Sequence, residues 1–155
     1  MTEVQVWISV LSPLLTFILA GAGWYFVYFN TNRIAKRAEV FSLVGKAVDK
    51  AVALDRRCAD YWLADQASRD STQAWIAGTT SEIYGMRALF ELLEKYHGFK
   101  GKDNLLVGAR QAATLDAEEV ARLDVSKLYE RRGEQIEALH NILRSLYSYY
   151  RVEHD

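Results

Sequence analysis

The sequence has little of what disulfide-stapled domains and cysteine-built metal sites require. Its 155 residues include one cysteine, Cys58, and three histidines. One cysteine cannot close an intramolecular disulfide, and a zinc site made of several cysteines is excluded as well. There is also a single proline, Pro13, so the chain beyond it carries no helix-breaking proline. These absences favour long helices.

Charge is nearly absent from the N-terminal part of the chain. No lysine or arginine precedes Arg33, and the only acidic residue there is Glu3. Over the whole chain, 19 Lys and Arg stand against 20 Asp and Glu, so no excess of positive charge would attract nucleic acid. We therefore expect no nucleic-acid partner.

The stretch Val4–Phe29 contains 26 residues without a charge. About 20 apolar residues in a helix cross a bilayer core of ~30 Å. We therefore expect residues 1–31 to form a retained transmembrane anchor and residues 32–155 to form a cytoplasmic part. A cleaved signal peptide would have a basic N-terminal region, where this chain has Glu3.

The start of this helix has two interpretations. Ser12-Pro13 resembles an N-cap followed by proline at the first helical position. Alternatively, the helix begins near Val4 and is kinked at Pro13. The sequence leaves both open.

Basic residues follow the uncharged stretch directly and none precedes it. The positive-inside rule therefore predicts a single pass through the cell (inner) membrane, with the N-terminus outside and the C-terminus in the cytoplasm. A second basic segment lies in the predicted loop Gly98–Asn104, which we expect to face the membrane. A bound anion or plain solvation are the alternatives for this loop. The residues expected to contact anionic lipid headgroups are Arg33, Lys36, Arg37, Lys100 and Lys102.

Small residues recur along one face of the predicted span at spacings of three and four. Such a stripe lets two helices approach closely in lipid, although small residues are also common in spans that do not associate. The predicted association face consists of Ser9, Ser12, Thr16, Ala20 and Gly23.

The rest of the chain has helical periodicity and no strand pattern. From Asn32 to about Ala64 the apolar stripe is Ile34, Ala38, Phe41, Val44, Val48 and Val52, with Trp62 near its end. No glycine or proline break separates this stripe from the span, so one helix can include both. A second helix, capped by Asp70 or Ser71, ends at His97-Gly98. Its stripe is Ile76, Thr79, Ile83, Met86, Phe90 and Leu93, and a break near Gly78–Ser81 is an alternative.

A short helix, Leu105–Ala113, and a long final helix complete the prediction. Asp116 with Glu119 resembles a capping box that opens the final helix. Its expected core stripe is Ile136, Leu139, Leu143, Leu146 and Tyr150. The fold class is all-α: a transmembrane helix followed by an antiparallel bundle of three long helices and a short one. If alternate long helices reverse direction, an aromatic cluster gathers at the membrane-distal end: Tyr61, Trp62, Trp75, Tyr147 and Tyr150.

Two Glu-x-x-His pairs are the best candidates for chemistry. Glu94 with His97 and Glu137 with His140 match the spacing found in ferritin-like di-iron bundles. The remaining glutamates of that ligand set have no counterpart, so we expect no metal. Cys58 has neighbouring arginines that would lower its pKa, but no base lies near it in sequence. We expect no cofactor and no enzymatic activity.

The leading functional hypothesis is therefore a membrane-anchored helical protein that acts by self-association or by binding another membrane or cytoplasmic protein, as a scaffold, adaptor or regulatory subunit. Confinement to a membrane raises the effective concentration of weakly binding helices. The alternative is a membrane-acting effector, of the toxin, exclusion or anti-phage type, whose span oligomerises and perturbs the membrane.

Overall fold

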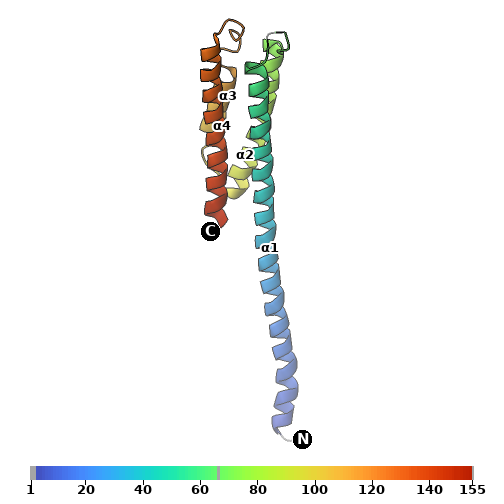
Figure 1. The fold of residues 1–155 in the computed structure, drawn as a ribbon. Coiled ribbons are helices and arrows are strands. Elements are labelled where there is room, and N and C mark those ends of the chain that lie inside the picture. Colours follow the sequence, from blue (N-terminus) through green and yellow to red (C-terminus); the bar gives the residue numbers. More distant parts are fainter. Residues whose placement is uncertain (1–2, 66, 155) are drawn as a thin grey trace. The chain divides into compact units, whose positions relative to one another are not determined.

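The computed structural model describes residues 3–65 and 67–154, with side chains described for residues 14–65 and 67–151. These ranges form four α-helices and contain no strand (Figure 1). The helices are α1 (Glu3–Trp62), α2 (Thr72–His97), α3 (Lys102–Thr114) and α4 (Val125–His154). The prediction of an all-helical protein is confirmed.

Helix α1 is one helix of 60 residues that begins at Glu3, the earlier of the two predicted starts, and includes Pro13. As expected, no break separates its apolar stretch from the residues that follow. The chain divides into two units, Met1–Glu39 and Val40–Asp155. The first is the N-terminal part of α1, and we call the second the compact unit. The predicted domain boundary between residues 31 and 32 stays a prediction.

The predicted core stripe of α1 is confirmed at Val44 and Trp62, which are buried, but is wrong at Phe41 and Ile34, which are 64% and 60% exposed. The buried face consists of Val40, Val44, Ala47, Ala51, Leu54 and Cys58. A step of one residue turns the helix by about 100°, so α1 has two neighbouring apolar stripes. The one with small residues at its centre packs closest to the other helices.

Helix α2 follows its predicted pattern. Its predicted core stripe is buried from Thr79 to Leu93, and Ile76 packs against the core. Ser71 is the N-cap and accepts a hydrogen bond from the Ala74 N–H at 3.3 Å. The predicted alternative of a break near Gly78–Ser81 does not occur. A Cβ at Gly78 would displace the guanidinium end of the flexible Arg57 side chain.

Helix α3 is longer than predicted, so the preceding loop shortens to residues 98–101. Gly98 and Gly101 adopt φ values of 76° and 87°, in the left-handed region that glycine tolerates best. At the C-terminus of α2, the Gly98 and Phe99 N–H groups donate to the carbonyls of Glu94 and Leu93, both at 3.2 Å. These bonds satisfy carbonyls that would otherwise be unpaired at the helix end.

The predicted capping box is wrong. Asp116 does not open α4: it has a φ of 59° in the turn after α3, and its carboxylate pairs with Arg131. Asp124 caps α4 instead, accepting hydrogen bonds from the Lys127 N–H at 2.8 Å and the Ser126 hydroxyl at 2.9 Å. Both hydrogen bonds stabilise the ionised carboxylate and so lower the pKa of the Asp124 carboxyl group. The bond from the Lys127 N–H has the larger effect.

The core stripe predicted for α4 is confirmed at Leu139 and Leu146, which are buried, and is wrong at Ile136, which is 43% exposed. Leu143 and Tyr150 are half-buried and pack against the core. The buried face also includes Arg132, Gln135 and Ile142. Two polar side chains therefore occupy core positions of this helix.

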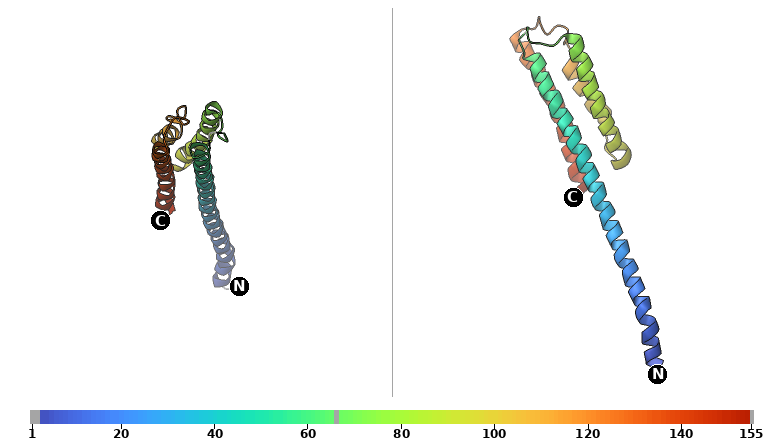
Figure 2. Two further views of the ribbon diagram at one scale, coloured as in Figure 1. Left: turned by 45° about the horizontal axis from the view of Figure 1, so that its top comes forward. Right: turned by 90° about the vertical axis from the view of Figure 1, so that its right-hand side faces the viewer.

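Within the compact unit, α1 runs antiparallel to both α2 and α4. Lys50 pairs with Glu82 at 2.8 Å, and the Tyr61 hydroxyl donates to Thr72 Oγ1 at 3.2 Å. The Phe41 and Tyr150 rings lie 5.9 Å apart, and Arg132 pairs with Asp55 at 2.7 Å. Figures 1 and 2 show α4 alongside this part of α1.

Candidate functional site

The N-terminal unit is the first candidate site. Helix α1 contains one stretch long and apolar enough to cross a membrane, and none of that stretch is buried in the protein. Thr16, Ala20 and Gly23 of the predicted association face are exposed. The side chains of Ser9 and Ser12 lie outside the described residues. A hollow of about 250 Å³ is lined by Ala20, Gly23, Trp24 and Val27.

The basic residues predicted to contact headgroups are not equivalent. Arg33, Lys36, Arg37 and Lys100 are exposed. Lys102 instead pairs with Glu94, whose carboxylate accepts its hydrogen bond and raises its pKa. Its charge is therefore already partly balanced. Contact of these residues with lipid stays a prediction.

The predicted aromatic cluster forms only in part. Tyr61 stacks on Trp75 with ring centroids 4.4 Å apart and an angle of 5°, and it meets Trp62 edge-on at 6.1 Å. The inclusion of Tyr147 and Tyr150 is wrong: Tyr147 is 59% exposed and Tyr150 contacts Phe41.

The reason for this error is the short helix. Helix α3 adds one more reversal of direction, so α4 runs back toward the start of the compact unit. Its C-terminal turns lie beside the C-terminus of α2, where the Tyr149 hydroxyl donates to the His97 carbonyl at 2.7 Å. Phe99, buried beside them, contacts both Phe90 and Tyr149.

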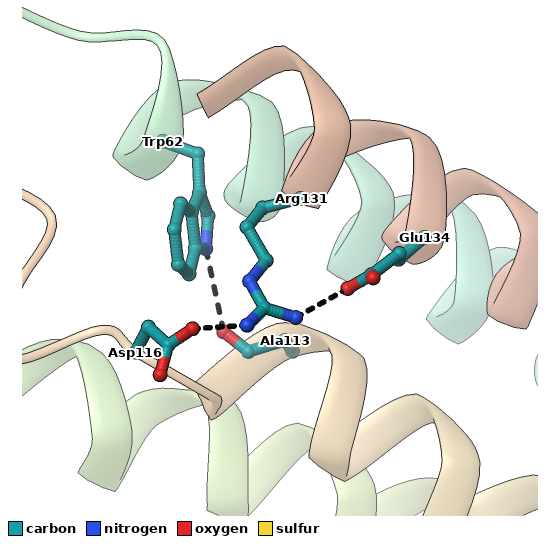
Figure 3. A network of polar contacts seen from close by, with 5 residues as sticks. All are labelled: Trp62, Ala113, Asp116, Arg131 and Glu134. Atoms are coloured by element: carbon teal, nitrogen blue, oxygen red, sulfur yellow. Dashed lines mark hydrogen bonds and ion pairs between the residues drawn. The ribbon is translucent and has the colours of Figure 1, made fainter. Parts of the chain in front are cut away.

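The two tryptophans share one acceptor at the C-terminal end of α3. The indole N–H groups of Trp62 and Trp75 both donate to the Ala113 carbonyl at 3.3 Å. Figure 3 shows the bond from Trp62. Carbonyls in the last turn of a helix have no partner within the helix, so the tryptophans satisfy this one. Beside it, Arg131 joins Asp116 to Glu134, the latter at 2.6 Å (Figure 3). The network connects all four helices and is structural in character.

Two arginines cover the aromatic rings. The guanidinium groups of Arg57 and Arg69 each lie 5.8 Å from a ring centroid, over Trp75 and Tyr61 respectively. Arg69 also donates to the carbonyls of Tyr61 at 2.9 Å and Ala64 at 2.8 Å, at the C-terminal end of α1. Sequence reasoning missed both contacts, because neither arginine lies at a helical spacing from its ring.

The lone cysteine is not activated. Cys58 is fully buried, and burial raises its pKa to about 12, an effect that outweighs Arg132 and Arg57. The expected lowering by neighbouring arginines is therefore wrong in direction. A thiol with this pKa is almost entirely protonated at neutral pH, and the nucleophilic form is the thiolate.

The weak metal candidates do not come together. Glu94 is committed to Lys102, and Glu137 and His140 are exposed on α4. Tyr149 binds the main-chain carbonyl of His97 on α2. Within residues 14–65 and 67–151, no group of three or more potential ligand side chains could hold a metal ion.

Of the polar residues in the core, the sequence predicted only Thr79. In addition to the Asp55–Arg132 pair, Thr79 and Gln135 are fully buried, and their side-chain polar atoms have no hydrogen-bond partner among the described residues. Comparison of the chain with protein-family models, curated proteins and solved structures found no match.

Proposed function

We propose that this protein is a single-pass membrane protein whose helical unit acts on the cytoplasmic side by self-association and by binding another protein, without catalysis. The proposal rests on one observation above all. The apolar stretch of α1 is long enough to span a membrane, and none of its described residues is buried within the protein. Exposed apolar surface of this extent requires a nonpolar environment.

The charge distribution supports the proposed orientation. The uncharged stretch ends just before Arg33, Lys36 and Arg37, which are exposed, and basic residues at one end of a span favour the cytoplasmic side. The compact unit completes the proposed architecture as an antiparallel bundle of three long helices and the short α3, in line with the antiparallel contacts of α1.

Open grooves on the compact unit support partner binding. One, of about 630 Å³, lies between α3 and α4 and includes Gly108, Ala112 and Ala138. Another, of about 540 Å³, lies between α1 and α2 and includes Ala53, Gly85 and Ala88. Small residues at the floor of a groove allow a helix of a partner protein to approach closely, as in helix-in-groove recognition.

Fractionation of cells that express the full chain tests the proposal. We expect the protein in the membrane pellet, resistant to alkaline carbonate and released by detergent, with the intact mass of the uncleaved chain. Recovery in the soluble fraction, or a mass that shows removal of the N-terminal segment, would overturn it.

The effector alternative is distinguished by a second measurement. A membrane-potential dye is added to cells in which the full chain is overexpressed. The proposal predicts an unchanged potential at high expression, whereas a collapse of the potential would favour the effector.

A further inference from the structure

Helices α1 and α4 each carry a second apolar stripe next to the buried one. On α1 it includes Phe41, Val48 and Val52, each one residue beyond a buried position. On α4 it includes Ile136, Leu143 and Tyr147, again one residue beyond buried Gln135, Ile142 and Leu146. We call these six residues the α1–α4 face.

The antiparallel arrangement makes the two stripes converge. A step of one residue turns each helix by about 100° about its own axis. Because α1 and α4 run in opposite directions, these turns have opposite senses when both are viewed from one end. The two stripes therefore lie either on the adjacent sides of α1 and α4 or on the sides that face apart. The contact between Phe41 and Tyr150, with ring centroids 5.9 Å apart, places them on the adjacent sides.

Phe41, Val52, Ile136 and Tyr147 of this face are exposed, whereas Val48 and Leu143 are half-buried against the core. Phe41 is 64% exposed, Tyr147 59% and Val52 38%. Large aromatic side chains bury roughly 150–250 Å² each, so the six residues offer on the order of 500 Å² of apolar surface. This is less than the ~800 Å² that each partner buries in a standard stable interface, so contact along the rest of α1 would add the remainder.

The sequence of α1 supports a partner that lies alongside this helix. The residues Ala20, Val27, Ile34, Phe41 and Val48 follow one another at intervals of seven. Apolar residues at seven-residue intervals are typical of helices that associate along their length. Two copies anchored in one membrane would present the same repeat to each other in parallel.

We propose that the α1–α4 face binds the same face of a second copy of this chain, around a two-fold axis parallel to α1. This proposal rests on the self-association in the proposed function and locates it on the compact unit as an isologous interface.

The test measures the mass of the full-length protein in detergent by light scattering over a range of concentrations. We introduce Ile136→Glu and Tyr147→Glu within the face, and Tyr84→Glu and Val107→Glu as matched controls. The control positions are 64% and 58% exposed on α2 and α3. We expect a wild-type dimer, face variants whose dissociation constant rises at least about tenfold, and controls equal to the wild type.

The other outcomes separate the two proposals. A dimer that survives both face variants would overturn the α1–α4 face but leave self-association standing, through the span. A wild-type monomer at every concentration would overturn both. Equal weakening by all four variants would also overturn the face, because the effect would then not depend on location.

Cross-linking keeps the test decisive if a glutamate variant fails to fold. Copies with Val52→Cys are co-expressed with differently tagged copies that carry Ile136→Cys, since these positions lie at nearly the same height. We expect a mixed disulfide-linked dimer under mild oxidation, and none from the control pair Tyr84→Cys and Val107→Cys. Equal cross-linking of both pairs, or none of either, would contradict the proposal.

Discussion

Helices α2 and α4 are both amphipathic, yet they bury different kinds of side chain. The core positions of α2 are apolar except for Thr79, with Met86, Phe90 and Leu93 fully buried. Helix α4 buries Leu139, Ile142 and Leu146 but adds Arg132 and Gln135 to its core positions. Both helices expose tyrosines, Tyr84 and Tyr96 on α2 and Tyr129 and Tyr147 on α4. The difference between the two helices therefore lies in the larger polar groups that α4 buries.

The largest expected effect sharpens this comparison at α2. Phe90→Ala removes a fully buried ring whose centroid lies 5.2 Å from that of the Phe99 ring. We expect the free energy of unfolding to fall by about 3–5 kcal/mol. Chemical denaturation of the full chain in detergent measures it. The control Tyr147→Ala on α4 should stay within about 0.5 kcal/mol of wild type; equal losses in the two variants would remove the contrast.

The ion pair between α1 and α4 should have an intermediate effect. Asp55→Asn leaves the Arg132 guanidinium, whose side chain is 11% exposed, without its charged partner. We expect a loss of about 1–2 kcal/mol, below the ~3–5 kcal/mol of fully buried pairs, because Asp55 is 40% exposed. The same denaturation experiment measures it. No change would show that this pair does not hold α4 against α1.

Gln135→Leu should stabilise the protein. It removes a buried amide without a partner among the described residues and adds apolar surface to the core, so we expect a gain of about 1 kcal/mol. Gln73→Leu, at an exposed position on α2, is the control and should be neutral. A clear loss of stability in Gln135→Leu would show that the amide is hydrogen-bonded in solution, for example to a buried water.

The smallest effect at neutral pH concerns Cys58. Its pKa in the folded protein is about 12, raised by burial from a reference of 9.0. A raised pKa means that the folded state keeps its proton while the unfolded state loses it. Stability is therefore unaffected below about pH 9 and falls by ~1.4 kcal/mol per pH unit between pH 9 and 12.

Two measurements check this prediction. The pH dependence of unfolding should lose this slope in Cys58→Ala, and a thiol reagent at pH 7 should label the wild-type protein only after unfolding. Rapid labelling of the native protein would contradict the burial of the thiol.

The parts of the fold that the sequence predicted correctly depend on local signals. The stripe of α2, its Ser71 cap and its end at Gly98 each follow from spacing or from the chemistry of a single residue. In α1 and α4 two apolar stripes lie one residue apart, and only tertiary packing decides which is buried. The pattern of Asp116 and Glu119 resembled a cap, but Arg131 holds Asp116 in a turn, and that ion pair joins residues that are distant in sequence.

The candidate sites show the same limit. Tyr61, Trp62 and Trp75 could be grouped because the turn between α1 and α2 is short. The misplacement of Tyr147 and Tyr150 came from one uncounted reversal at α3. The convergence of α1 and α4 on one face was beyond sequence reasoning, because it depends on which stripe of each helix is buried.

The most direct test of the central claim is a topology measurement in intact cells. Single cysteines, Thr2→Cys and Ser148→Cys, are introduced into the full chain, and wild type with its buried Cys58 serves as the control. We expect a membrane-impermeant maleimide to label position 2 in intact cells and position 148 only after permeabilisation. Labelling of position 148 in intact cells, or labelling of neither position in membranes after permeabilisation, would contradict a membrane-spanning α1 with a cytoplasmic helical unit.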